Sequence, residues 1–296
     1  MTPHEFGGDW TEQKLAILDD YLAAYCSIFT KNERARFFQT TYVDAFAGSG
    51  LIQPSTPAVE TESLFAELGE PEAVTLLQGS ARRAIEHSFD RYLFIEKSPA
   101  RVADLEAMKA ASPNRERIII RQGDANARLL KFVAETDWKK NRAVVFLDPY
   151  GMQVEWKTIA GLGATKAVDL WLLFPLGQAV MRLLQRTKEP PPEWQFALDR
   201  IFGTHKWIER FYITQPEPDF FDAERVSSFR TADWNQVAAF MLERLATAFD
   251  AVSSRPGVLW NSQNSPLYLL CFAAANRIAA PTALNIAADL LKKLNS

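Results

Sequence analysis

Cysteine is scarce in this chain. Only Cys26 and Cys271 occur among its 296 residues, and each lies among apolar neighbours. Two such residues supply neither a disulfide framework nor the thiolate cluster of a structural zinc site. The three histidines, His4, His87 and His205, also lack the spacing of metal ligands. We therefore expect two buried core thiols, a reducing compartment and no bound metal ion.

Long apolar runs are absent as well. No stretch of about 18 apolar residues occurs, and Met1–Trp10 is mixed and polar, so we expect neither a transmembrane helix nor a signal peptide. The net charge of -3 provides no overall field that would attract nucleic acid, so such a partner would need a local basic patch. With 48% hydrophobic and 23% charged residues, the composition is typical of a globular protein, which we expect in the cytoplasm without a membrane partner.

The strand-like segment from Thr41 to Gly50 is the most informative part of the sequence. It is apolar up to the acidic Asp44 and then breaks into a turn, where the missing Cβ atoms of Gly48 and Gly50 let the backbone approach a ligand closely. A dinucleotide-binding turn would need glycine or alanine at position 53, which is Gln53 here. An acid before the turn suits a ligand with an ammonium or sulfonium group better than one with a pyrophosphate.

The pattern Asp-x-Phe-x-Gly-x-Gly, formed by Asp44, Phe46, Gly48 and Gly50, resembles the first motif of class I S-adenosylmethionine (SAM) methyltransferases. It is particularly similar to the motif of those enzymes that methylate exocyclic amines, and it implies SAM as the cofactor. Two alternatives stay open at this point. One is a glycine turn in another kind of α/β protein, and the other is a dinucleotide-dependent dehydrogenase.

Strand-like and helical segments alternate along the chain. Apolar runs typical of buried parallel strands lie at residues 38–46, 92–96, 117–121, 143–147 and 167–174. Because helical patterns separate them, we expect an α/β fold of the class I, Rossmann-like type with helices on both faces of the sheet. We interpret residues 1–296 as one methyltransferase-like domain. Its additions are an N-terminal helix at 11–30, a mostly helical insertion at 190–250, and closing antiparallel strands with a C-terminal helix at 251–296.

Residues 52–78 separate the glycine turn from the first helix expected on the sheet, at 81–89, for which Gly79-Ser80 looks like the cap. Connections of this length are usually lids, binding loops or disordered segments. Another helix is expected at 178–185, before the run of three prolines at 190–192.

Acidic residues follow four successive strands of this pattern. They are Asp44, Glu96, Asp124 and Asp148. Ligands of open α/β sheets bind outside the carboxyl ends of the strands, so these side chains would share one site. On one SAM molecule, Asp44 would lie near the ammonium and sulfonium groups, Glu96 would accept from both ribose hydroxyls, and Asp124 would accept from the adenine amine. Taken singly, such an acid is more often a helix cap or a solvated turn residue.

Asp148 is left for the methyl acceptor, so the segment Asp148-Pro149-Tyr150-Gly151 carries the chemistry in this interpretation. Methyl transfer is an in-line displacement that depends mainly on positioning. The Asp148 carboxylate and the Pro149 carbonyl would bind the two hydrogens of an exocyclic amine. Tyr150 would stack on the ring, a contact worth roughly 1 to 3 kcal/mol. The structural alternative is that Pro149 and Gly151 shape a turn while Tyr150 packs on the insertion.

Lys14, near the start of the N-terminal helix, would reach the SAM carboxylate, unless it is an ordinary exposed lysine. The candidate cofactor-binding residues are Lys14, Asp44, Phe46, Gly48, Gly50, Glu96, Lys97, Asp124, Ala125 and Asp148. The candidate catalytic residues are Asp148, Pro149 and Tyr150.

As a whole, the chain resembles the three-Cys-motif partner protein family, whose members are similar to class I SAM methyltransferases. The matching segments lie at 14–25, 42–50, 79–80, 94–97, 123–124, 148–151, 169–175 and 265–276, which together span most of the chain. The resemblance implies a methyltransferase-like fold and a partner protein with three cysteines, but no substrate.

One departure concerns the methyl acceptor. The motif of amino-methyltransferases usually has two prolines before its aromatic residue, and here Tyr150 stands where the second proline would be. The element is also similar to the Asp-Pro-Phe-Gly of tRNA guanine-N2 methyltransferases, so adenine and guanine amines both stay open. The sequence favours a SAM-dependent methyltransferase that acts on an amine nitrogen of a nucleobase or nucleotide-like molecule, including RNA and DNA, or of the partner protein. The competing interpretation is a non-catalytic SAM-binding or scaffold subunit of the three-cysteine partner.

Overall fold

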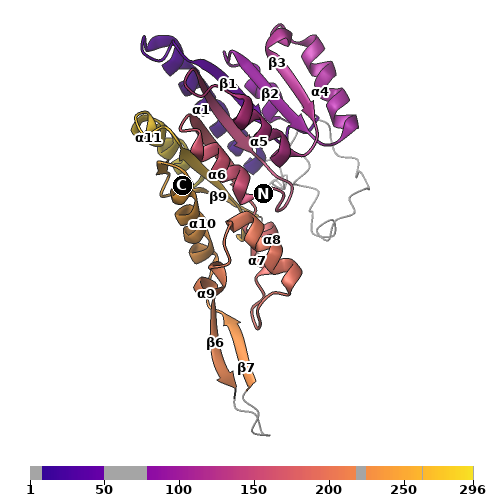
Figure 1. Ribbon diagram of the computed structural model, residues 1–296, viewed down its shortest axis with the longest axis vertical. Helices are drawn as coiled ribbons and strands as arrows, with labels where there is room; N and C mark the ends of the chain where they lie inside the picture. Colours follow the sequence, from indigo (N-terminus) through magenta and orange to yellow (C-terminus); the bar gives the residue numbers. More distant parts are fainter. Residues whose placement is uncertain (1–8, 50–78, 218–224, 262, 296) are drawn as a thin grey trace, which may run out of the picture.

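The computed structural model describes residues 9–49, 79–217, 225–261 and 263–295 (Figure 1). Its strands are β1 (Gln39–Asp44), β2 (Arg91–Glu96), β3 (Ile118–Gln122), β4 (Asn141–Leu147), β5 (Val168–Phe174), β6 (Tyr212–Glu217), β7 (Arg225–Arg230), β8 (Ala251–Val252), β9 (Gly257–Trp260) and β10 (Pro266–Ala274). Its α-helices are α1 (Asp9–Lys31), α3 (Ser80–Ala84), α4 (Pro99–Ala111), α5 (Ala125–Glu135), α6 (Trp156–Ala164), α7 (Met181–Leu183), α8 (Pro192–Phe202), α9 (Trp207–Phe211), α10 (Trp234–Ala248) and α11 (Ala280–Leu291). Short turns of other helix types are η2 (Arg115–Arg117), η3 (Leu176–Val180) and η4 (Lys292–Leu294). The connection expected at 52–78 lies outside the described residues.

The main sheet has eight strands in the order β3-β2-β1-β4-β5-β10-β8, and β9 also pairs with β10. Strands β1 to β5 are parallel, whereas β10 runs antiparallel to β5. This order, with an antiparallel strand beyond β5, is that of the class I, Rossmann-like methyltransferase fold, as the sequence predicts. The chain first builds outward from β1 to β3 and then returns to β4. The topological switch point, where ligands bind in such sheets, therefore lies between β1 and β4.

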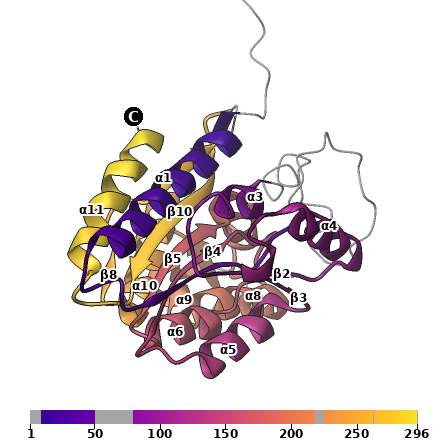
Figure 2. The same cartoon turned by 90° about the horizontal axis from the view of Figure 1, so that it is seen from above.

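Helices cover both faces of the sheet (Figure 2). Helices α1, α3, α4 and α11 pack on one face, and α5, α6, α8 and α10 pack on the other. Side chains alternate between the two layers along each central strand: in β4, Val144 and Phe146 face α1, while Val145 and Leu147 face the opposite layer. Because both faces are buried, the parallel strands read as continuous apolar runs, which is why the sequence revealed them.

The region at 190–250 differs from the mostly helical insertion that we expected. It contains α8 and α9, then the antiparallel hairpin β6–β7, and then α10. The hairpin extends away from the main sheet (Figure 1). Pro216 lies within β6. Proline interrupts a helix, but it is tolerated in an edge strand, and both strands of this two-stranded sheet are edge strands. α10 is not peripheral, since Val237, Met241 and Leu245 join the core that covers the sheet.

Three helices have boundaries that the sequence pattern does not indicate. Helix α6 is not predicted from the sequence, because its two glycines lower the helix propensity of the segment. Gly163 permits close packing of α6 on α10, because a Cβ there would lie 2.3 Å from the Ala248 carbonyl oxygen. Helix α3 ends at Ala84 instead of 89, after which the ring of His87 contacts Asp19 on α1 at 2.8 Å. The helix expected at 178–185 begins earlier, as the π-helical turn η3, and ends as α7 at Leu183.

The segment that follows α10 adds antiparallel strands and a helix to the sheet. Both β8 and β9 pair antiparallel with β10, and α11 follows and packs against α1. Cys26 and Cys271 are both buried free thiols. Within the part of the chain that the structure describes, no helix combines the length and apolar character needed to cross a bilayer.

Candidate functional site

The candidate site lies at the carboxyl ends of β1 and β4, where the strand order reverses. Asp44, the last residue of β1, is in register with Phe146 of β4, and Asp148 follows two residues later. The adjacent strand ends therefore bring the two carboxylates together. Both side chains are shielded from solvent, with relative exposures of 0% for Asp44 and 4% for Asp148.

Lys14 joins these carboxylates from α1. It is fully buried, its ammonium group lies 2.5 Å from Asp148 Oδ2, and it sits over the Phe146 ring at 5.5 Å from the centroid. Burial lowers the pKa of Lys14 and raises the pKa of Asp148, while the attraction between the two groups opposes both shifts. The exposed-lysine alternative for Lys14 is therefore wrong. Its contact in the structure is the carboxylate that we expected to face the methyl acceptor.

Asp44 has a different set of partners. Its Oδ2 accepts from the Ser80 hydroxyl at 2.6 Å, and its Oδ1 accepts from the Phe46 backbone N–H at 3.2 Å. Burial raises the pKa of Asp44 to about 7, and the charge of Asp148 adds to the effect, whereas Ser80, Phe46 and Lys14 counter it. A carboxylate with this pKa gains from any cation brought beside it, because an added positive charge favours its ionised form.

Two further side chains beside Asp44 were not assigned to the site from the sequence. Ser80 looks like a helix cap in the sequence, but its side chain makes no capping bond and instead contacts Asp44. Tyr42 is fully buried, and its hydroxyl has no hydrogen bond of acceptable geometry to the described residues. Burial and the charges of Asp44 and Asp148 raise its pKa well above the usual range. A buried polar group without a partner is costly, so Tyr42 adds an unused hydrogen-bonding group to the site.

Glu96 ties the glycine turn to the next strand. Its Oε2 accepts from the Gly48 backbone N–H at 3.0 Å, and its Oε1 accepts from the Ser98 backbone N–H at 2.8 Å. Gly48 has a φ of 61°, in the left-handed region that favours glycine. Each carboxylate oxygen can accept a second hydrogen bond, so Glu96 still has capacity for a ribose hydroxyl.

The remaining candidates differ in their exposure. Asp124 is exposed and caps α5, accepting from the Ala127 backbone N–H at 2.9 Å through Oδ1. Lys97 is exposed, Phe46 is half-buried and Ala125 is buried. Gly50 lies outside the described residues. The structure thus brings Lys14, Asp44 and Asp148 into one buried group and leaves Asp124 at the rim.

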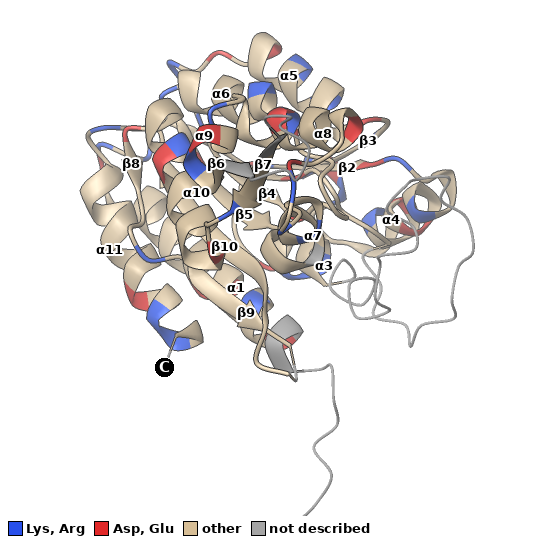
Figure 3. Cartoon of the chain, turned by 90° about the horizontal axis from the view of Figure 1, so that it is seen from below, with Lys and Arg blue, Asp and Glu red and all other residues tan. Residues whose placement is uncertain are grey.

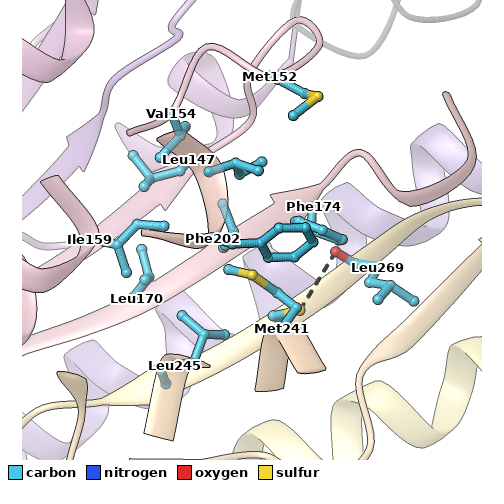
Figure 4. Close-up of a cluster of buried hydrophobic side chains, with 14 of the residues drawn as sticks. Leu147, Met152, Val154, Ile159, Leu170, Phe174, Phe202, Met241, Leu245 and Leu269 are labelled. Carbon is cyan, nitrogen blue, oxygen red and sulfur yellow. Dashed lines mark hydrogen bonds between the residues drawn. The ribbon is translucent and has the colours of Figure 1, made fainter. Parts of the chain in front are cut away.

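The segment after Asp148 forms a loop that returns into the core. Pro149 is buried, Tyr150 and Gly151 are half-buried, and Gly151 has a φ of 66°. Met152 and Val154 then enter the apolar cluster on the α6 face of the sheet, where Val154 lies beside Leu147 and Ile159 (Figure 4). Tyr150 therefore lies between the buried Pro149 and the buried Met152 along this loop.

The chain was also compared with known proteins. No protein-family model and no curated protein matches the sequence. Among solved structures, a spermidine synthase bound to a transition-state analogue shares 11% identity at a TM-score of 0.41, covering 93% of this chain and 63% of that chain. A glycopeptide N-methyltransferase complexed with SAM shares 13% sequence identity at a TM-score of 0.34, and the match covers 86% of this chain and 94% of that chain. A conserved hypothetical protein of Streptococcus pyogenes shares 18% sequence identity at a TM-score of 0.31, and the match covers 51% of this chain and 76% of that chain.

Proposed function

We propose that this protein binds SAM at the carboxyl ends of β1, β2 and β4 and transfers its methyl group to an amine nitrogen. The observation that carries the proposal is the Asp44 carboxylate, which is fully buried beside Asp148 and whose pKa burial raises to about 7. It lies next to a glycine turn at the topological switch point of a class I methyltransferase sheet. SAM has both an ammonium and a sulfonium group, and when bound it supplies an electrophilic methyl.

The charges around Asp44 favour a cationic ligand. Among the described residues, Lys14 is the one buried cation beside these two carboxylates, and it lies against Asp148 rather than Asp44. A pyrophosphate would add negative charge to this group, whereas an ammonium would offset the second carboxylate. The charge distribution therefore supports SAM over a dinucleotide.

Each of the other candidates has a role that its position permits. Glu96 would accept from the ribose hydroxyls with the lone pairs that Gly48 and Ser98 leave free. Asp124, at the exposed rim, would accept from the adenine amine with Oδ2, because Oδ1 caps α5. Tyr42 and Lys14 would meet the amino-acid end of the ligand.

The acceptor would bind against the loop that begins at Asp148. Asp148 Oδ1 and the Pro149 carbonyl would hold the hydrogens of an exocyclic amine, and Tyr150 would cover one face of its ring. We propose a nucleobase or nucleotide-like acceptor, free or within RNA or DNA. Along the described part of the ribbon in Figure 3, acidic and basic positions are interspersed. A long nucleic acid would therefore depend on a local basic patch.

A second candidate function is a non-catalytic SAM-binding or scaffold subunit of a three-cysteine partner protein. The observation in its favour is the Lys14–Asp148 ion pair, because Oδ2 of the proposed acceptor-binding carboxylate already has a partner. The partner itself is proposed on the resemblance of the motifs alone.

Two measurements on the purified full chain test these proposals. Calorimetric titration with SAM and its demethylated product should show binding at micromolar concentrations, about -8 kcal/mol, that Asp44→Ala and Glu96→Ala abolish. Incubation with methyl-labelled SAM and nucleosides, tRNA or DNA should then transfer label to one acceptor class. Binding without transfer to any acceptor, with or without a three-cysteine partner, would favour the scaffold. A folded wild-type protein that binds no SAM would contradict the cofactor proposal.

A further inference from the structure

Asn126 is a buried polar residue whose side chain spans two elements of the site. It is the second residue of α5, two positions after the capping Asp124, and its relative exposure is 5%. Its Nδ2 donates to the Gln153 carbonyl at 2.8 Å. Its Oδ1 accepts from the Glu155 backbone N–H and from the Thr158 hydroxyl, both at 2.9 Å. One amide side chain thus binds three groups between Gln153 and Thr158, at the end of the loop that begins at Asp148 and at the start of α6.

These contacts replace bonds that the loop does not make for itself. Glu155 is the N-cap residue of α6, yet its side chain makes no capping hydrogen bond. Its carboxylate instead contacts Lys157 and Arg200. Asn126 therefore supplies, from another helix, an acceptor for the backbone at the start of α6.

The loop from Asp148 to Glu155 is consequently fixed at both ends. Lys14 on α1 holds Asp148 at its start, and Asn126 on α5 holds Gln153 and Glu155 at its end. Tyr150, the proposed acceptor platform, lies between the two attachments. The second attachment begins two residues from Asp124, the proposed partner of the cofactor's adenine.

We propose that Asn126 is a positioning residue that sets the conformation of the 148–155 loop and couples it to cofactor binding beside Asp124. The coupling rests on the proposed function, whereas the positioning of the loop does not. When SAM binds beside the start of α5, it restricts the motion of Asn126. The hydrogen bonds of Asn126 to Gln153 and Glu155 then restrict the motion of the loop that carries Tyr150. The residue touches no reacting atom and acts through the backbone of the loop.

Asn126→Asp provides a variant whose hydrogen bonding depends on pH. Protonated, the new carboxyl keeps a donor toward the Gln153 carbonyl and an acceptor toward Glu155 and Thr158; ionised, it places negative charge against that carbonyl. Burial should raise the pKa of the introduced carboxyl. Along α5 the charged groups nearest to position 126 are Asp124 and Arg128. On the facing segment they are Glu155 and its partners Lys157 and Arg200.

Hydrogen exchange of the full chain, followed by mass spectrometry of peptides from 149–158, tests the positioning role. Relative to wild type at the same pH, Asn126→Asp should match at about pH 5 and exchange about tenfold faster at about pH 8, and Asn126→Ala should exchange faster at both. Asn114→Asp is the matched control, since Asn114 Nδ2 donates to the Ile85 carbonyl at 3.1 Å, away from this loop. Wild-type exchange of the loop in both Asn126 variants would overturn the proposal.

Addition of SAM separates this proposal from the proposed function. SAM should slow exchange of 149–158 in wild type, and in Asn126→Ala it should bind without slowing that segment. Equal slowing in both proteins would overturn the coupling while leaving the cofactor proposal intact. If wild type binds no SAM, the cofactor proposal fails and the coupling fails with it, whereas the ligand-free exchange still decides the positioning role.

Discussion

Asp44 and Asp148, at the ends of β1 and β4, differ sharply from Glu96 and Asp124, at the ends of β2 and β3. The first two are fully shielded, contact side chains of α3 and α1, and have raised pKa values. The other two use their oxygens to accept from backbone N–H groups, and Asp124 is exposed. All four lie at or within two residues of the carboxyl end of a strand. We attribute the difference to what packs over each strand end.

The comparison indicates which of the four acidic residues occupy electrostatically unfavourable positions. Glu96 and Asp124 have backbone N–H groups as hydrogen-bond partners without a ligand. Asp44 is buried beside a second carboxylate, an arrangement that reduces stability and is characteristic of functional sites. We therefore expect Asp44 and Asp148 to respond most strongly to substitution and to pH.

The largest expected effect on stability follows from removing the Lys14 ammonium from its buried ion pair with Asp148. Lys14→Met leaves Asp148 buried without its counter-ion and should lower the free energy of unfolding by about 3 to 5 kcal/mol. Denaturant unfolding measures the loss. Adding Asp148→Asn to Lys14→Met should recover part of it, because the uncompensated charge is removed. The matched control is Lys97→Met at an exposed site, and equal losses for the two lysines would contradict the buried-pair account.

The next effect concerns the pH dependence of stability. The pKa of Asp44 is about 7 in the folded protein and about 3.9 in an unfolded chain. Between these values the unfolded chain releases its proton first, so the contribution of Asp44 to stability falls as pH rises from about 4 to about 7, by up to about 4 kcal/mol. Asp44→Asn cannot ionise and keeps groups able to bond Ser80 and Phe46. The variant should therefore be more stable than wild type at about pH 8 and similar at about pH 4.

Thermal or denaturant unfolding at both values of pH measures this difference. Asp169, a buried acid with a pKa of about 6 whose partners are Tyr21 and Arg142, is unchanged in the variant and cancels in the comparison. A wild-type protein that is more stable than Asp44→Asn at the higher pH would show that Asp44 is stabilised in its ionised form.

Glu96→Gln should have a smaller effect on stability. Glutamine offers one acceptor oxygen in place of two, so either the Gly48 or the Ser98 backbone N–H loses its partner, at a cost of about 1 to 3 kcal/mol. Unfolding by denaturant checks this value. No change in stability would mean that the carboxylate does not hold the glycine turn.

Asp124→Ala should have the smallest effect, about 1 kcal/mol, because it removes the cap of α5. Asp233→Ala is a matched control, since Asp233 caps α10 in the same manner and lies outside the site. The two variants should lose similar stability, but only Asp124→Ala should weaken SAM binding. Equal SAM affinity in both would assign Asp124 to capping alone.

Much of the fold follows from the sequence. The parallel strands are buried on both faces, so each is a continuous apolar run, and the intervening helices set the parallel topology. The hairpin β6–β7 does not follow, because the packing of α8, α9 and α10 decides how the proline-containing segment between them is used. Helix α6 is also hidden, since the reason for Gly163 is the Ala248 carbonyl on a distant helix.

The candidate site is only partly accessible from the sequence. Acids at strand ends are visible as residues that follow apolar runs, but their burial depends on α1 and α3. Lys14 and Asp148 are 134 positions apart, and Ser80 reaches Asp44 across 36 positions. Such contacts form only when the helices dock on the sheet. Asn126 escapes notice for the same reason, because its partners at 153–158 belong to another helix start.

The most direct test of the account is SAM binding by wild type and Asp44→Asn at about pH 6 and about pH 8. Titration of SAM itself affects both proteins alike, so the ratio of their affinities isolates Asp44. With a pKa of about 7, the ionised fraction of Asp44 rises about tenfold over this interval, and wild-type affinity relative to Asp44→Asn should rise by the same factor. A ratio that does not change with pH would contradict the claim that the buried Asp44 carboxylate receives the cationic end of the cofactor.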